Sequence, residues 1–389
     1  MLHRLFGMDS RRLETLFRAF CAMPRPVRGA ILRLVCRFGR RRVGWLPTPP
    51  RLIWYVTARC NLRCAHCFFA EHLGKVAGEL STDEFRRVAA SLKTRLRSCS
   101  LTGGEPFLRD DLPDLCRILA EVNRTQLVTL PTNGYDPERT LGMLREILET
   151  AALRVNAQVS LDGTADVHDR VRGRPGAFER AVETAKGLAD LKARYGRLNN
   201  ISVITTITAA NAGCLDDLIA LVRRELPDLF HKFQFVRGAS TDVFGVPDGW
   251  LSDFDPTELG KPDDIPGLTE HLAEVILEWG DTLLLRRQVE LLRLTSRIQT
   301  EKRPAVACLA GRIDGVILAD GGVALCEHTR PVANLRDFDL DFHALWHSPA
   351  AEEARKQIRR CFCTHPCNLA TSASFNVATL ERLTQRHYR

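Results

Sequence analysis

Three cysteines lie close together in the run TARCNLRCAHCFF, where Cys60, Cys64 and Cys67 are separated by three and then two residues. One short loop therefore offers three thiolates to a metal. Iron–sulfur clusters that only carry electrons usually have four cysteine ligands, so three would leave one iron open to a substrate. The alternative is a structural zinc ion with His66 or His72 as its fourth ligand.

Further residues suited to ligand binding follow the next predicted strands. The run GGEP supplies two glycines, which let a backbone approach a ligand closely, and an acid that suits an amino group. The later segment VSLDGTADVHDRVRGRPGAF adds a serine, aspartates and arginines, and a guanidinium suits a carboxylate. Asp162 as a turn cap and Asp169 in a surface ion pair are the alternatives in this segment.

In combination these motifs resemble the radical S-adenosylmethionine (SAM) superfamily. The resemblance implies that the three cysteines hold a 4Fe-4S cluster whose open iron binds SAM. It also implies that an electron, delivered by a partner such as flavodoxin or ferredoxin, cleaves SAM to a 5′-deoxyadenosyl radical. That radical would abstract hydrogen from an unactivated C–H bond. The cofactor-binding residues implied are Gly103, Gly104, Glu105, Asn133, Ser160, Asp162, Arg172 and, near the adenine, His66.

A second set of cysteines lies near the end of the chain. With Gly311, Gly322, Asn334 and Trp346, this segment resembles the SPASM and twitch domains, which hold auxiliary 4Fe-4S clusters. The resemblance implies one auxiliary cluster, although the spacing of the last three cysteines is unusual and leaves their ligand roles open. A structural zinc site is the alternative. The candidate ligands are Cys308, Cys326, Cys361, Cys363 and Cys367.

The other cysteines are expected to be buried small residues without a metal role. They are Cys21, Cys36, Cys99, Cys116 and Cys214.

Alternating strand and helix patterns run from residue 51 to about residue 240. Strands are predicted over 51–57, 99–102, 126–132, 153–163, 201–207 and 232–236, and helices over about 81–97, 112–123, 137–150, 177–193 and 215–224. Six such units, with the family resemblance, predict an α/β fold: a partial (β/α)6 TIM-like barrel with a small C-terminal iron–sulfur domain. Parallel sheets bind ligands at the carboxyl ends of their strands, where the motifs fall.

The expected domains are an N-terminal arm (1–50), the barrel (51–240), a linker with two helices (241–304), the auxiliary-cluster domain (305–372) and a tail (373–389). Residues 238–265 are rich in glycine, aspartate and proline and predict a linker or lid. Helices are predicted over about 267–280 and 282–299.

The net charge of +8 belongs to the arm, because residues 1–50 hold eleven arginines, no lysine and only Asp9 and Glu14 as acids. Two amphipathic helices are predicted there. They would lie on an anionic membrane surface, bind an acidic partner or pack on the barrel. The chain shows no secretory signal and no run of about 18 apolar residues. A cytoplasmic location is expected, with a peripheral position at a membrane left open, and no sequence-specific binding of nucleic acid.

The sequence predicts the type of chemistry but leaves two classes of substrate open. A peptide or protein side chain or backbone comes first, although no winged-helix recognition domain is expected. Oxidation or epimerisation of a sugar, cofactor or lipid-linked small molecule is the alternative. A non-enzymatic scaffold or electron carrier would not explain GGEP and SLDG together. The catalytic residues are unknown; conceivable hydrogen donors are Tyr135, Cys214, Cys363 and Glu327.

Overall fold

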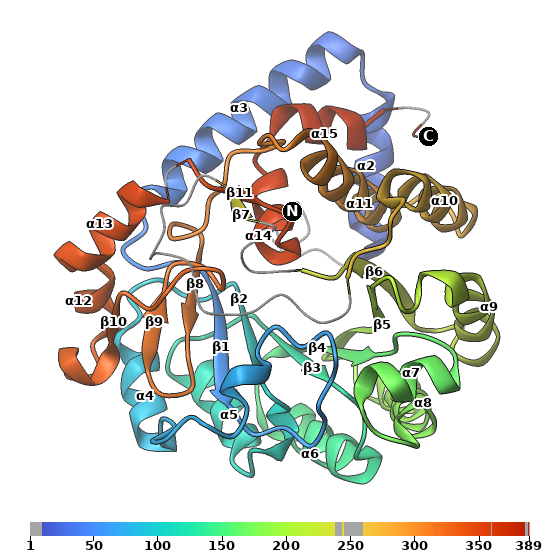
Figure 1. The fold of residues 1–389 in the computed structure, drawn as a ribbon. Coiled ribbons are helices and arrows are strands. Elements are labelled where there is room, and N and C mark those ends of the chain that lie inside the picture. Colours follow the sequence, from blue (N-terminus) through green and yellow to red (C-terminus); the bar gives the residue numbers. More distant parts are fainter. Residues whose placement is uncertain (1–9, 238–242, 245–259, 359, 386–387, 389) are drawn as a thin grey trace.

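Six parallel strands form the centre of the fold in a computed structural model, which describes residues 10–237, 243–244, 260–358, 360–385 and 388 (Figure 1). Each strand pairs in parallel with the next along the chain, and the sheet does not close. The predicted α/β partial barrel is therefore confirmed. The strands are β1 (Arg51–Thr57), β2 (Ser98–Gly103), β3 (Leu127–Thr132), β4 (Arg154–Ser160), β5 (Leu198–Ile207) and β6 (Phe230–Phe235).

Helices cover the outer face of this sheet, and their apolar sides form one core with it. Trp54 of β1 stacks on Phe85 of the first of these helices with ring centroids 3.9 Å apart. The outer helices are α4 (Thr82–Ser91), α5 (Leu112–Glu121), α6 (Pro137–Thr150), α7 (Ala165–Arg172), α8 (Ala177–Arg194) and α9 (Leu215–Glu225). Short 3-10 turns lie at η1 (Ala70–His72), η2 (Pro106–Leu108) and η3 (Ala212–Cys214).

Two helices of the barrel differ from the prediction. The helix expected to reach residue 97 ends at Ser91, because the Asn123 side chain accepts the Leu96 N–H at 2.7 Å and holds the following segment out of the helix. Helix α7 was not predicted at all. Gly173 ends it in a left-handed conformation with φ of 69°, which glycine adopts without strain.

The C-terminal segment continues the barrel sheet. Strand β8 (Asp314–Ile317) pairs in parallel with β1, and β9 (Gly322–Ala324) and β10 (Ala333–Asn334) add antiparallel strands beyond it. The predicted domain boundaries are not tested by this continuity and stay predictions. The remaining elements are β7 (Val243–Phe244), α10 (Ile265–Glu278), α11 (Leu283–Glu301), η4 (Leu335–Phe338), α12 (Phe342–Trp346), α13 (Pro349–Gln357), β11 (Phe362–Cys363), α14 (Pro366–Ala373) and α15 (Val377–Leu383).

The N-terminal arm forms the two expected helices, α2 (Ser10–Ala22) and α3 (Arg25–Val43). Figure 1 shows α3 along the outer edge of the molecule beside α15. Arg40 of α3 donates to the Phe375 carbonyl, with Nη2 at 2.7 Å. Among the described residues, no helix is long and apolar enough to cross a membrane. The predicted linker or lid falls mostly outside those residues.

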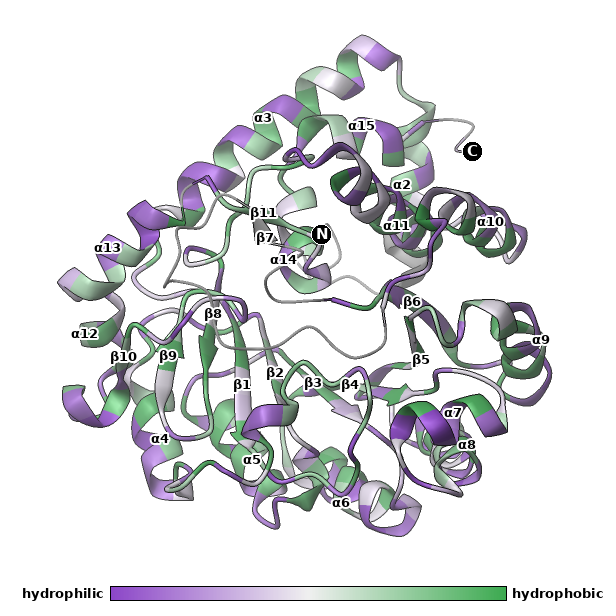
Figure 2. Cartoon of the chain, in the orientation of Figure 1, coloured by the Kyte–Doolittle hydropathy of each residue, from purple (hydrophilic) through white to green (hydrophobic). Residues whose placement is uncertain are grey.

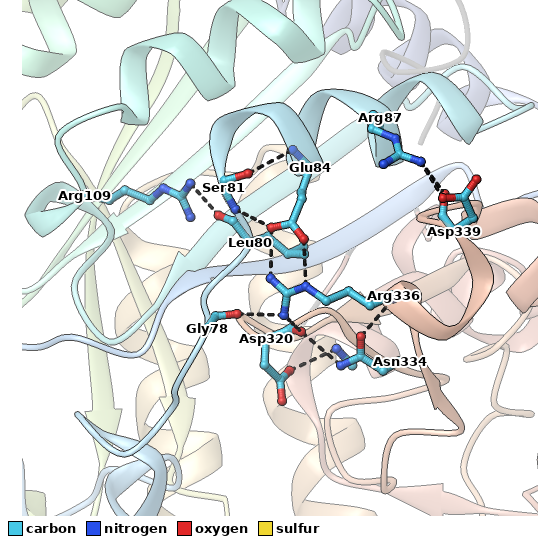
Figure 3. Close-up of polar contacts among 11 residues, drawn as sticks. Gly78, Leu80, Ser81, Glu84, Arg87, Arg109, Asp320, Asn334, Arg336 and Asp339 are labelled. Atoms are coloured by element: carbon cyan, nitrogen blue, oxygen red, sulfur yellow. Dashed lines mark hydrogen bonds and ion pairs between the residues drawn. The ribbon is translucent and has the colours of Figure 1, made fainter.

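Arg336 joins the C-terminal segment to the barrel (Figure 3). Its Nε and Nη2 donate to the two carboxylate oxygens of Glu84 at 2.7 and 2.9 Å, and its Nη1 donates to the carbonyls of Gly78 and Asp320. Glu84 also closes the predicted capping box with Ser81 at the start of α4. A bidentate pair of this kind fixes orientation as well as distance.

Replacing Arg336 by alanine is expected to lower the free energy of unfolding at neutral pH by about 1 kcal/mol, a small value because the pair is partly exposed. The Arg336 hydrogen bond lowers the pKa of Glu84 to about 2. The decrease in the free energy of unfolding should therefore be largest above the ordinary glutamate pKa, and it should become smaller as pH falls towards 2. Urea unfolding of the metal-free protein measures it. Arg86→Ala, an exposed arginine of α4, is the control, and an equal loss there would contradict the prediction.

Candidate functional site

The three-cysteine loop directly follows the carboxyl end of β1. It turns on itself where the Cys67 N–H donates to the Cys64 carbonyl at 3.0 Å, and the Leu62 N–H lies 3.5 Å from the Cys60 sulfur. Burial raises the pKa of Cys60 to about 11 and also raises that of Cys67. The thiols of Cys60 and Cys67 thus keep their protons at neutral pH until a metal displaces them.

The glycines of GGEP pack against this loop. The N–H groups of Gly104 and Glu105 donate to the carbonyls of Thr57 and Arg59 at 2.9 and 2.8 Å. A Cβ on Gly103 would lie 2.0 Å from the Thr57 oxygen, and one on Gly104 would lie 2.2 Å from the Arg59 oxygen. The sequence suggested that these glycines let a ligand approach. The structure gives a second reason, which is the close approach of the loop's own backbone.

Helix α7 holds the other side of the cysteine loop. The Ala65 N–H donates to the Val171 carbonyl at 2.8 Å, and a Cβ on Gly173 would lie 2.5 Å from the Arg63 oxygen. The loop is therefore held between the end of β2 and the end of α7. This contact was missed from the sequence because α7 was not recognised.

Glu105 ties the ends of β2 and β3 together. Its buried carboxylate accepts the Asn133 N–H at 2.8 Å and the Phe107 N–H at 3.3 Å, and burial raises its pKa to about 7. The Asn133 side chain in turn donates to the Asn61 side chain at 2.8 Å. These contacts link the third strand to the cysteine loop.

Asp162 and Arg172 form a buried ion pair of 2.6 Å at the end of β4. Asp162 also accepts the Thr206 N–H from β5 at 2.8 Å, and Arg172 Nη1 lies 3.6 Å from the Cys64 sulfur. Asp162 therefore positions Arg172 instead of capping its own turn. His66 lies 3.8 Å from Asp162, and burial lowers its pKa to about 4, so it is neutral at pH 7.

The second acid of this segment also differs from expectation. Asp169 accepts the N–H groups of Gly176 and Phe178 at 2.6 and 2.8 Å at the start of α8. Asp169 thus secures the α7–α8 connection and forms no ion pair with a described residue.

A cavity of about 220 Å³ lies at the carboxyl ends of the six strands. Asp162 is not part of its lining and stands behind Arg172. Two buried lining atoms, Arg172 Nε and His66 Nδ1, have no hydrogen-bond partner among the described residues. Of the residues singled out from the sequence, the lining holds Cys60, Cys64, His66, Cys67, Gly103, Gly104, Glu105, Asn133, Ser160 and Arg172.

Several lining residues were missed from the sequence, and Gln234, Arg237 and Phe68 are among them. Gln234 and Arg237 lie at and just beyond the end of β6, where the rule that ligands bind at strand ends would have found them. Phe68 follows the third cysteine, and the Arg237 guanidinium lies 3.8 Å from the centre of its ring. Together they form the wall towards the C-terminal segment.

Comparison with family models identifies residues 54–219 with the radical SAM superfamily. This stretch carries both the three-cysteine loop and the strand ends that line the cavity. Residues 54–219 of this chain form a radical SAM domain. The family predicted from the motifs is thereby confirmed.

The chain is similar to proteins that are named for different products. Pre-heme d1 synthase of Dinoroseobacter shibae is 30% identical over 200 residues, covering 49% of this chain and 46% of that protein. Mycofactocin maturase MftC of Mycobacterium ulcerans is 35% identical over 190 residues, covering 46% of each. The chain thus spans less than half the length of these two relatives.

A solved structure shares the fold over most of the chain. It is Streptococcus suis SuiB bound to S-adenosylmethionine, with a TM-score of 0.55 at 14% identity, covering 82% of this chain and 70% of SuiB. At this identity the likeness shows the fold alone.

The second cysteine set of this radical SAM chain divides into two parts. The thiols of Cys308 and Cys361 hydrogen-bond to each other, which lowers the pKa of Cys308 and raises that of Cys361. Cys326 is buried close to both Cys363 and Cys308: burial raises its pKa, and thiolate charges on those two neighbours raise it further. The Asn368 side chain donates to the Cys326 sulfur at 2.8 Å. Four thiols thus gather in one place.

Cys367 belongs to a different group. Its sulfur lies within 4.8 Å of ligand atoms of Glu327 and His365. Glu327 is buried and contacts the Tyr55 hydroxyl, the His365 ring and Arg237 Nη1, the last at 3.1 Å. The Arg237 cation already balances the Glu327 charge, which disfavours a metal ion in this group. The fifth cysteine therefore stands apart from the other four.

Proposed function

We propose that this chain is a radical SAM enzyme that cleaves SAM reductively and abstracts hydrogen from an unactivated C–H bond of its substrate. The observation that carries the proposal is the three-cysteine loop, held between β2 and α7 beside a cavity where Arg172 Nε and His66 Nδ1 lack partners. Buried polar atoms without partners are costly, so a polar ligand there would stabilise the protein. SAM, with a carboxylate, an amino group and an adenine, has the polar groups to meet them.

The residues present fit both groups. Cys60, Cys64 and Cys67 would hold a 4Fe-4S cluster with one iron open. Bound there, it would supply the electron, received from flavodoxin or ferredoxin, that cleaves SAM to the radical that takes the substrate hydrogen. Other contacts to SAM are assigned to the Gly103 and Gly104 backbone, Glu105, Asn133, Ser160, Arg172 and His66. Asp162 would act through Arg172, whose guanidinium it keeps in place.

We assign the auxiliary cluster to Cys308, Cys326, Cys361 and Cys363. Three thiols on one zinc ion would lie about 4 Å apart. In the described part of the chain, the one group whose ligand atoms all lie within 4.8 Å is Glu327, His365 and Cys367. No three sulfur atoms of either cysteine set all lie within 4.8 Å of one another in the described residues. This spacing, wider than that of thiols on one zinc ion, suits a four-iron cluster better. A cluster at the four thiols would accept an electron from the substrate radical or hold the substrate in place.

A peptide or protein side chain or backbone is the substrate class we favour. The similarity to the antilisterial bacteriocin subtilosin biosynthesis protein AlbA of Bacillus subtilis, 31% identical over 146 residues, supports it. SuiB, which shares the fold, has been solved bound to the precursor peptide SuiA. A cofactor of the tetrapyrrole type is the second candidate, favoured by the similarity to pre-heme d1 synthase. Either substrate would enter past Arg237 and Phe68, which line the cavity on the side of the C-terminal segment.

The test of the chemistry is release of 5′-deoxyadenosine. Protein reconstituted anaerobically with iron and sulfide receives SAM and dithionite, and Cys64→Ala serves as the inactive control. The wild type is expected to form the product and the variant to form none, because two thiolates cannot hold the open-site cluster. Zinc in place of iron in purified protein, or equal product from both proteins, would overturn the proposal.

The same assay separates the two substrate classes. Coproporphyrin III added to the reconstituted enzyme should leave 5′-deoxyadenosine formation unchanged if the substrate is a peptide. A several-fold increase would favour the tetrapyrrole candidate.

A further inference from the structure

Exposed large apolar side chains gather on the N-terminal arm. Within the described residues, seven such side chains are exposed, and six of them precede residue 46. The arm members are Leu16, Met23, Val27, Leu34, Phe38 and Trp45. A concentration of this kind marks an interaction surface, because scattered single exposures would be ordinary.

Three of these side chains share the outward face of α3. A helix turns by about 100° per residue, so Val27, Leu34 and Phe38 lie within about 20° of one line along its axis. Their exposures are 49%, 68% and 66%. The opposite side, with Leu32 and Cys36, is buried. Helix α3 therefore has one apolar side against the protein and a second facing outward.

The outward apolar stripe continues into a cavity beside it. A cavity of about 350 Å³ opens between α2, α3, α11, α14 and α15, and most of its lining side chains are apolar. Leu16 and Met23, both exposed, line it together with Ile31 of α3. Figure 2 shows apolar and polar residues alternating along α3 at the edge of the molecule. The apolar surface thus extends from the stripe to α2.

Arginines flank the stripe, and α3 holds seven of them with no acid. Arg37 and Arg41 lie about 80° and 40° from the stripe around the helix. Neither these two nor Arg42 forms an ion pair with any described residue, and all three are exposed. Residues 1–50 carry a net charge of +9, so two copies of the arm would repel each other. An apolar stripe flanked by arginines is complementary to a binding partner with an apolar interior and negative charges at its surface.

We propose that α3 binds flat on an anionic phospholipid bilayer, with Leu34 and Phe38 in the acyl region and Arg37 and Arg41 at the phosphates. Trp45, 86% exposed just beyond the helix, suits the level of the headgroups. This surface is independent of the SAM site, so it neither rests on the proposed function nor alters it. Binding here would bring the enzyme to the surface of a membrane.

Sedimentation of the full chain with vesicles tests the proposal. Vesicles of phosphatidylcholine with phosphatidylglycerol should bind the protein at least tenfold more tightly than phosphatidylcholine alone, and salt should weaken the binding. Leu34→Ser with Phe38→Ser should lose at least tenfold in affinity, as should Arg37→Gln with Arg41→Gln. Leu284→Ser removes a side chain of α11 that is 51% exposed and lies outside both the α3 stripe and the lining of the cavity, and it should change nothing.

The variants should keep the wild-type circular dichroism spectrum and their 5′-deoxyadenosine release, since α3 lies outside the SAM cavity. Equal affinity for both vesicles, no binding to either, or equal loss in the Leu284 variant would overturn the proposal. So would concentration-dependent dimers abolished by the Leu34 and Phe38 changes, or binding to polyglutamate but not to vesicles. Those last two results would assign the face to a second copy or to an acidic protein.

Discussion

Gly103→Ala is expected to disable the three-cysteine loop and to lower the free energy of unfolding by about 3 kcal/mol or more. The new Cβ would lie 2.0 Å from the Thr57 carbonyl oxygen, and φ at this position is +139°, which side chains rarely adopt. Thr57 ends β1 and leads into the cysteines, so relief of the clash must shift the loop. Iron content and 5′-deoxyadenosine release should both fall by tenfold or more.

Gly142→Ala is the matched control. Gly142 lies in α6, where an added Cβ would meet nothing within 4 Å. Alanine should stabilise that helix by about 0.5–1 kcal/mol and leave iron content unchanged. Urea unfolding of both metal-free variants gives the comparison. A Gly103→Ala protein that holds iron and releases product as the wild type does would show that the close packing of β2 against the loop is not required.

Removing two of the four gathered thiols is expected to halve the iron content. The double change Cys308→Ala with Cys361→Ala breaks the hydrogen-bonded thiol pair and leaves only Cys326 and Cys363. Two thiolates cannot retain a four-iron cluster, so iron should fall from about eight to about four atoms per chain. The cluster at the SAM site should remain, because Cys60, Cys64 and Cys67 are untouched.

The matched double variant is Cys214→Ala with Cys367→Ala, which removes two thiols outside the four-thiol group. It should keep about eight irons. Loss of four irons here would make Cys367 a ligand and contradict the assignment from proximity. Metal analysis showing one zinc ion in place of four irons would instead favour the structural-zinc alternative.

The strands, a helix cap and the motifs of the site could be predicted from the sequence because they depend on neighbouring residues. The six strands were predicted with ends correct to within three residues, since alternating apolar runs and turn residues are local signals. The capping box of Ser81 and Glu84 could likewise be predicted, because its two residues are only three positions apart. The three cysteines, followed by GGEP and SLDG, carried the resemblance to the superfamily because each of these motifs is a short run of neighbouring residues.

Contacts between distant segments were decided only by the tertiary structure. Nothing near Asp162 in the sequence shows that its carboxylate pairs with Arg172 and accepts a hydrogen bond from Thr206 on the next strand. The division of the last cysteines into four gathered thiols and a separate Cys367 depends equally on how the chain folds back. Strand β8 joins β1 because the parallel sheet leaves that edge unpaired. These contacts form because the folded chain packs residues together that are far apart in the sequence. The spacing of the residues along the chain does not indicate them.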